Sequence, residues 1–394
     1  MGFGYLLLSY YNALLDDDIV MLRSVREQGI IGATIGQYES WNTRWMSFLF
    51  LHSWMYFWNE DSSPLLYHLF TLTTLLCSFR RLARGLSAKG LINPAGKAEI
   101  RFYAALMTAA LLAATYHIGD TWFWVNTSTM YGWNLTAIVC TLSLVLLPLK
   151  NSLLQDIFIS HAGLYVGGAA EPAVACLLIL LPSLLFFKKE LSPSCRRDIT
   201  HFLIGMMVSF GIALVGEGHG RRAAALPDLP FITYLWKSAY FSAKIAWYHS
   251  PLRVLMVLVL LLPLFSKLKN EPDLRPLQTA LLALSAWIGV ILIHTFFITW
   301  IMGDYGPERA WSFISLWTVL VAGWWWYKSG TRLMERAGHL PSWAACLVIA
   351  WVLFVQLRVL PAYHDYVKSV RNKEQHFDPE KIPDSGLLHR MNSI

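Results

Sequence analysis

The sequence predicts an all-α integral membrane protein, and three observations carry that prediction. Of its 394 residues, 56% are apolar and only 14% are charged, whereas a soluble domain carries about 25% charged residues. The apolar residues gather in runs bounded by charge, as do helices that cross a bilayer, each of which needs about 20 residues. Many of the 18 tryptophans stand near the ends of these runs, which is typical of an interfacial belt.

The apolar runs predict about eleven membrane-crossing helices. The first run is short for a span, and it lacks the basic residues that precede the apolar part of a cleavable signal, so we expect no signal peptide. The predicted helices lie near 1–15, 64–79, 100–118, 131–149, 153–169, 172–187, 200–216, 251–265, 277–301, 311–328 and 343–361.

Basic residues concentrate between particular helices, and this pattern predicts the orientation of the chain. Because lysine and arginine flank membrane helices on the cytoplasmic side, we place the basic loops there. This explains the net charge of +7 without a nucleic-acid partner. The basic loops are 80–101, 188–197, 267–275 and 328–336. The segments predicted on the opposite side are 16–63, 119–130, the turn at Glu171, 216–250 and 302–310.

Residues 44–58 decide whether that orientation is consistent. If they crossed the bilayer, the loop after residue 79 would move outside, against the charge rule. We therefore expect a half-penetrating or surface-lying helix there, which makes 16–63 one extracytoplasmic region.

Two longer segments carry amphipathic patterns that suit helices lying on a membrane. These are 17–43, in the first extracytoplasmic region, and 231–249, in the second, long extracytoplasmic loop over 216–250. Short connections inside and elaborated ones outside place the functional surface outside. The predicted membrane domain covers 1–361, and 362–394 form an extracytoplasmic tail.

Three aspartates, at 16–18, close the first apolar run. Carboxylates at a bilayer boundary cost several kcal/mol if they move inward, so they face water, a cavity or a ligand. A partly shielded carboxylate can act as a general base, and Trp41 and Arg44 follow on the same predicted region. The alternative is that the acids only solvate a helix end.

Two further turns combine charge with glycine. The turn at 215–222 contains His219, Arg221 and Arg222, and its arginines could hold a phosphate bidentately or contact lipid head groups. The turn at 303–310 contains Asp304 and Arg309, which could face a ligand or cap the next helix.

The remaining candidates lie in the middle of the chain. Residues 120–131 combine aromatic and small polar side chains, as in a sugar-stacking or re-entrant surface, or in an aromatic belt. Tyr131 ends this stretch. Glu171 stands between two closely spaced helices, as a ligand or as a turn residue.

Taken in order, these positions resemble the GT-C superfamily of polytopic membrane glycosyltransferases. They are most similar to a largely uncharacterised bacterial GT-C-like family with D-D-Y, W-x-G-R, W-x-x-x-x-x-x-Y, G-x-x-x-E and P-G-N-x-x-R motifs. The matching positions are Asp17-Asp18-Ile19, Trp41-Asn42-Thr43-Arg44, Trp124 to Tyr131, Gly167 to Glu171, and Glu217-Gly218-His219-Gly220-Arg221-Arg222. The chain departs from the family at Ile19, at Thr43 and in the last motif, where Glu217-Gly218-His219 replace the Pro-Gly-Asn turn.

The resemblance implies transfer of a sugar from a polyprenyl-phosphate-linked donor to an acceptor hydroxyl, on the outer face of a bacterial cytoplasmic (inner) membrane. Asp17 or Asp18 would be the base, or would hold a divalent metal if one is used. Membrane lipid, and protein partners in an envelope assembly, are further implied contacts. The implied substrate-binding residues are Trp41, Arg44, Tyr131, Glu171, His219, Arg221, Arg222, Asp304 and Arg309, of which Arg44, Arg222 and Arg309 would offset the charge of the lipid phosphate.

Two other functions stay open. A transporter or flippase of a lipid-linked or anionic solute would need polar groups at mid-helix positions. His201 and His294 are candidates for such groups, and we expect both to be core histidines with satisfied hydrogen bonds. The departures from the family pattern also allow a catalytically inactive GT-C-like subunit of a larger assembly.

Overall fold

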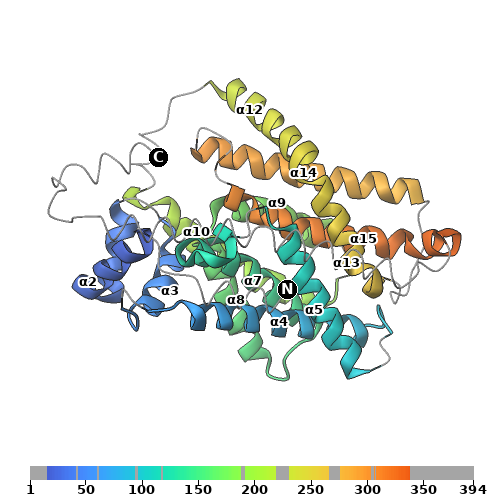
Figure 1. Cartoon of the computed structure of the whole chain (residues 1–394), viewed down its shortest axis with the longest axis horizontal. Helices are drawn as coiled ribbons and strands as arrows, with labels where there is room; N and C mark the ends of the chain where they lie inside the picture. The colour runs from blue at the N-terminus through green and yellow to red at the C-terminus, as the bar shows by residue number, and fades with distance from the viewer. Residues whose placement is uncertain are drawn as a thin grey trace.

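The computed structural model describes ten stretches of the chain, and within them the chain forms helices and turns without an extended strand (Figure 1). The described residues are 16–40, 43–59, 62–93, 96–116, 119–187, 191–218, 230–265, 276–302, 306 and 308–337. The longer helices are α2 (Asp16–Ser40), α3 (Trp45–Met55), α4 (Leu65–Ala88), α5 (Lys97–Ala114), α7 (Trp133–Leu146), α8 (Ser152–Gly167), α9 (Glu171–Phe187), α10 (Pro193–Leu214), α12 (Phe231–Lys244), α13 (Pro251–Phe265), α14 (Pro276–Met302) and α15 (Ser312–Ala337). The short turns of helix are η1 (Gly119–Phe123), α6 (Val125–Thr127), η2 (Ser128–Gly132), η3 (Ile245–His249) and η4 (Glu308–Trp311).

Several of these helices are long and apolar enough to cross a membrane. In the described part of the chain, three satisfy both conditions: Val125–Leu146, Pro193–Leu214 and Gln278–Met302. The bent pair α12 and α13, with 48° between its halves, would add a fourth. This is the architecture of a helical membrane protein.

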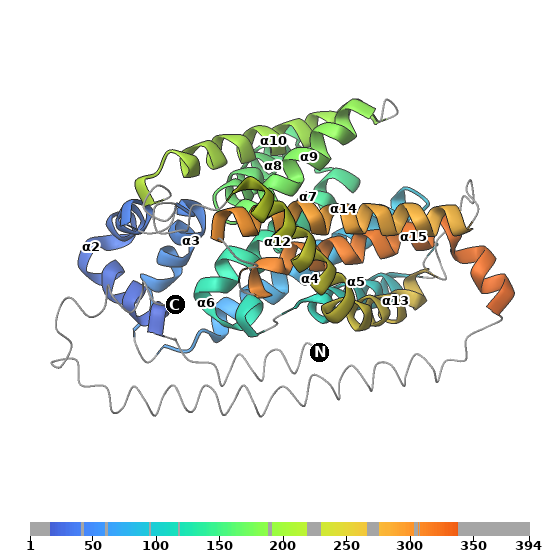
Figure 2. The ribbon, with the colours of Figure 1, turned by 90° about the horizontal axis from the view of Figure 1, so that it is seen from above.

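The helices are arranged in layers along one long axis (Figure 2). In that view α8, α9 and α10 lie along one side, α14 and α15 run through the middle, and α5 and α13 lie along the other side. Both views place α2 and α3 together at one end of the molecule.

The closest helix packing joins α8 to α10 and depends on glycine. A Cβ atom at Gly163 would overlap the Phe202 carbonyl, and one at Gly167 would overlap the Met206 carbonyl. Gly205 on α10 faces α8 in the same way. Small residues spaced four apart let two backbones approach closely, which replaces the hydrophobic driving force that lipid does not supply.

Two predicted loop boundaries are wrong. The loop predicted from residue 80 begins later, because α4 continues through Arg80, Arg81 and Arg84 to Ala88. Arginine is a good helix former, and cations stabilise the C-terminal end of a helix. Similarly, α10 begins at Pro193, inside the loop predicted over 188–197.

The segments predicted to lie on the membrane surface, 17–43, 44–58 and 231–249, each contain a helix. Helix α3 occupies 45–55, and its 11 residues extend only about 17 Å, too short to cross a bilayer, as predicted for 44–58. A helix is present in 231–249, as α12 and η3. Helix α2 is bent at Gly29, where φ is 71° and ψ is 173°, a conformation that glycine adopts without strain.

The basic ends of several helices lie together at one end of the bundle. Arg81, near the end of α4, donates to the Leu147 carbonyl at the end of α7. Arg197, in the first turns of α10, lies 3.2 Å from Asp156 at the start of α8. Helix α8 ends at Gly167, shortly before Glu171 begins α9. The basic cluster of Arg81 and Arg197 and the Glu171 carboxylate therefore lie at opposite ends of α8. The positive-inside rule predicts this separation of charge.

Candidate functional site

Residues 119–132, named here the buried turn segment, form the centre of the candidate site. The segment consists of η1, α6 and η2, two of which are π-helical turns. Such turns are rare and often occur at functional sites. We expected 119–130 at the extracytoplasmic surface, but from residue 121 to 132 every residue is buried except Trp124.

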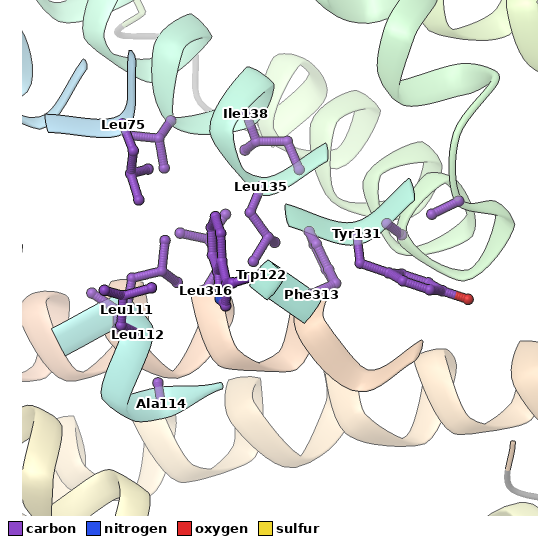
Figure 3. Packing of buried hydrophobic residues seen from close by; sticks show 14 of the residues in the cluster. Leu75, Leu111, Leu112, Ala114, Trp122, Tyr131, Leu135, Ile138, Phe313 and Leu316 are labelled. Atoms are coloured by element: carbon purple, nitrogen blue, oxygen red, sulfur yellow. The ribbon is translucent and has the colours of Figure 1, made fainter. Parts of the chain in front are cut away.

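The segment is buried because its aromatic side chains are part of the hydrophobic core. Trp122 is 1% exposed, and its Nε1 donates to Thr115 Oγ1 at 3.1 Å. Figure 3 shows Trp122 in a hydrophobic cluster with residues of four helices. The labelled members from those helices are Leu75 of α4, Leu111 and Leu112 of α5, Leu135 and Ile138 of α7, and Phe313 and Leu316 of α15.

Asp18 reaches the buried turn segment from α2. Its side chain is fully buried, and its Oδ1 accepts a hydrogen bond from the Asn126 backbone N–H at 3.0 Å. Hydrogen bonds to a carboxylate are stronger than those between neutral groups, so this contact holds α2 against α6. Asp17, its neighbour, is exposed.

Arg44 and Glu171 meet at the other end of the segment. Arg44 Nε and Nη2 both approach Glu171 Oε2, at 2.9 and 2.8 Å. Arg44 Nη1 donates to the Tyr131 hydroxyl at 3.1 Å. Burial alone would lower the pKa of Arg44, but the adjacent Glu171 carboxylate outweighs it and raises that pKa above its ordinary value. Arg44 thus contacts both Glu171 and Tyr131, and all three residues were predicted separately as substrate-binding.

Arg309 approaches the segment from η4. Its guanidinium carbon lies 5.1 Å from the centre of the Trp124 ring, within the range of a cation–π contact. Arg309 therefore contacts the same stretch of chain as Asp18 and Arg44, although η4 lies far along the sequence.

Two tyrosines that the sequence interpretation missed also fix the buried turn segment. The Tyr67 hydroxyl donates to Ser128 Oγ at 3.0 Å, and the Tyr165 hydroxyl donates to the Thr129 carbonyl. Both tyrosines lie within predicted apolar helices, where a hydroxyl group needs a partner if it is buried. The presence of a tyrosine hydroxyl inside an apolar helix was therefore the sequence signal for a buried hydrogen bond, although it does not identify the partner.

Five predicted site residues lie outside the described residues: Trp41, His219, Arg221, Arg222 and Asp304. Their assignment stays a prediction. As for the metal considered at Asp17 and Asp18, the part of the chain described here contains no group of three or more His, Cys, Asp or Glu side chains suited to a metal ion.

An apolar groove lies between α9, α12 and α14. Its volume is about 460 Å³, and its lining is almost entirely hydrocarbon. The wall formed by α14 includes Phe296 and Phe297, about one and a half turns before the end of that helix at Met302. The rest of the lining is Ile179, Leu235, Ser238, Ala239, Leu292 and Ile293.

Fold and composition together define this chain as a helical membrane protein. Comparison with models of protein families, with curated proteins and with solved structures gave no match. The GT-C resemblance therefore depends on the residues quoted for it.

Proposed function

We propose that this protein is a GT-C-type glycosyltransferase of a bacterial inner membrane. It would have about eleven membrane helices and transfer a sugar from a polyprenyl-phosphate-linked donor to an acceptor hydroxyl at the extracytoplasmic face. The observation that carries the proposal is the convergence on the buried turn segment. Asp18 and Arg44, from the region near the N-terminus, and Arg309, from far along the sequence, each contact it, at the end of the bundle opposite the basic cluster.

The two aspartates suit different roles. Asp18 is buried and bonded to the backbone of Asn126, so it positions the segment and supplies negative charge. Asp17 is exposed one residue earlier and is accessible to an acceptor. We assign proton removal to this pair, with Asp17 as the first candidate for the base.

The proposed step balances as a substitution at the anomeric carbon. The acceptor oxygen forms a bond to that carbon, its proton passes to the carboxylate, and the bond from carbon to phosphate oxygen breaks with its electron pair kept by the phosphate. An acceptor hydroxyl ionises far above neutral pH and needs such a base. A cation near the departing phosphate stabilises the charge that develops there.

The two described arginines of the site have different proposed roles: Arg44 positions the site, and Arg309 binds the phosphate. Arg44 is buried against Glu171, so we assign this pair to positioning Tyr131 and the buried turn segment. Arg309, over Trp124, is the described residue that we assign to the phosphate charge. Arg222 would join it if its predicted role is correct.

The lipid chain of the donor needs an apolar path that opens to the bilayer. The groove between α9, α12 and α14 has that character, with an apolar lining. It ends about 8 Å before the C-terminus of α14, at 1.5 Å per residue, and η4 with Arg309 follows that helix. A polyprenyl chain bound in this groove would place the phosphate head group of the donor on the side of Arg309.

Conservative variants test the proposal in a strain that lacks the gene. Asp17→Asn and Asp18→Asn keep the side-chain shape and an acceptor oxygen but remove the charge, and we expect the double variant to lose the transferred sugar from envelope glycans. Asp156→Asn, at the opposite end of the bundle, is the matched control and should restore it. Mass spectrometry of the glycans is the measurement. Unchanged glycans with the double variant, at equal protein level, would eliminate the transferase.

One observation favours the alternative of a transporter or flippase. His294, in the apolar helix α14, is fully buried, and neither ring nitrogen has a hydrogen-bond partner within the described residues. Our prediction of a core histidine with satisfied hydrogen bonds is therefore wrong for His294. Polar groups inside membrane helices are costly and often mark a transport path. Loss of solute uptake into vesicles in His294→Leu, with glycans unchanged, would support this alternative.

A further inference from the structure

Three side chains of the buried turn segment carry polar atoms that make no hydrogen bond to any described part of the chain. Thr121 Oγ1, Trp124 Nε1 and Asn126 Oδ1 are shielded from solvent, and none has a partner within the stretches that the structure describes. Thr121 is fully buried and Asn126 is 5% exposed. A buried polar atom without a partner costs about 1–3 kcal/mol, and native structures seldom contain several together unless a ligand or water satisfies them.

The chemistry of these atoms limits what would satisfy them. The Trp124 indole N–H only donates, the Asn126 amide oxygen only accepts, and the Thr121 hydroxyl does both. A molecule with several hydroxyl groups satisfies all three types, because each hydroxyl both donates and accepts. A purely apolar ligand would satisfy none.

Charges of both signs lie beside these atoms. The Asp18 carboxylate is bonded to the Asn126 backbone, and the Arg309 guanidinium lies over the Trp124 ring. An uncharged group at the three atoms is repelled by neither charge, and it leaves Arg309 for the phosphate of the proposed donor. Trp124 is the one partly exposed residue of 121–132, so we place the entrance beside it.

We propose that Thr121, Trp124 and Asn126 form a subsite that binds an uncharged, hydroxyl-bearing ring, that is, a neutral carbohydrate, beside Asp18. The inference rests on the proposed function in one respect: the ring is the sugar or the acceptor of the transfer. The subsite itself is a binding site, and it can be tested without any transfer.

The structure offers variants that separate binding from folding. Thr121→Val removes the hydroxyl and keeps the shape, and because Thr121 Oγ1 has no partner in the described protein, we expect the melting temperature to be unchanged or slightly higher. Asn126→Leu removes the amide oxygen in the same way. Thr108→Val is the matched control, since the Thr108 hydroxyl bonds the Ala104 carbonyl within α5.

Saturation-transfer NMR on the full chain, in a zwitterionic detergent without sugar head groups, measures the binding. The probes are glucose, galactose, mannose and N-acetylglucosamine, with glucuronate and glucosamine as charged comparators. We expect a signal from at least one neutral sugar, weakened about tenfold, or 1.4 kcal/mol, in Thr121→Val and Asn126→Leu and unchanged in Thr108→Val.

Three results would overturn the subsite: no neutral sugar gives a signal, Thr121→Val binds as the wild type does, or a charged comparator binds best. The outcome is distinguishable from that of the transferase test. Specific binding in a protein whose aspartate variants leave glycans unchanged supports the subsite and removes the transferase. If sugar transfer depends on Asp17 and Asp18 but sugar binding is unchanged in Thr121→Val, the transferase is supported and the subsite is removed.

Discussion

Arg44 and Glu171, 127 positions apart in the sequence, form a buried ion pair in which two guanidinium nitrogens approach one carboxylate oxygen at 2.9 and 2.8 Å. Their side chains are only 9% and 10% exposed. The pair joins the start of α3 to the start of α9, and through Tyr131 it joins both to the buried turn segment. Among the described residues, the pair is thus a buried polar connection between the start of α3 and the helix bundle.

Removing one partner of this pair should be costly. Glu171→Ala leaves the Arg44 charge buried, and we expect a loss of about 3–5 kcal/mol. Glu171→Gln keeps an acceptor and should lose less. The melting temperature of the purified protein measures the effect. As a control, Asp156→Ala breaks a pair whose Arg197 side chain is 40% exposed, and exposed pairs contribute about 0–1 kcal/mol. Equal melting temperatures for Glu171→Ala and Asp156→Ala would show that the buried pair stabilises the fold no more than the exposed one.

The α8–α10 contact gives a second prediction. Gly163→Ala and Gly205→Ala each place a methyl group against backbone of the other helix, which should destabilise the protein by about 1–3 kcal/mol. Gly211→Ala, in the same α10 but with open space around it, should gain about 0.5–1 kcal/mol from helix propensity. Thermal unfolding of the three variants in one detergent tests the difference. If Gly163→Ala matches Gly211→Ala, the helices do not pack as described.

His52 of α3 gives a pH dependence. His52 is fully buried, and its Nδ1 lies 2.9 Å from Thr34 Oγ1 of α2. Because the Thr34 hydroxyl donates to the Ile30 carbonyl, the imidazole is the donor in that contact. Burial lowers the pKa of His52 from 6.5 to about 4.

The sign of the effect follows from that lowered pKa. Between pH 4 and 6.5 the unfolded chain binds the proton and the folded chain does not, so stability is complete above pH 6.5 and falls as the pH is lowered toward 4. The loss reaches at most about 3 kcal/mol. His52→Asn, which keeps a donor for Thr34 but does not titrate, should show a smaller fall. The difference between wild-type and variant melting curves over this range isolates His52. Parallel curves would contradict the lowered pKa.

Much of the fold was predictable, whereas the contacts in the candidate site were not. Apolar runs bounded by charge located most of the described helices, whereas the helices predicted at 1–15 and 343–361 lie outside the described residues. Helix α4 continued through Arg80 because a charged residue marks the membrane boundary and not the end of a helix. Residues 120–131 were identified as polar and aromatic, yet their burial depends on Leu111, Leu135 and Phe313 surrounding Trp122 (Figure 3). The pairing of Arg44 with Glu171 is likewise a tertiary contact, and no local pattern in one sequence predicts it.

The last prediction concerns the dynamics of the buried turn segment. Tyr165→Phe removes the hydrogen bond to the Thr129 carbonyl, a net contribution of about 1 kcal/mol. That carbonyl belongs to a π-helical turn, whose own hydrogen bonds are less regular than those of an α-helix. We therefore expect faster amide hydrogen exchange over 125–132 with little change elsewhere.

Tyr103→Phe removes the hydroxyl bonded to Glu99 in α5 and serves as the control. Amide exchange occurs from locally opened states, so its rate rises as the free energy of local opening falls. Lowering that free energy by about 1 kcal/mol corresponds to about a fivefold increase in the exchange rate. Unchanged exchange in Tyr165→Phe would mean that the segment is held by Asp18, Arg44 and Tyr67 without it.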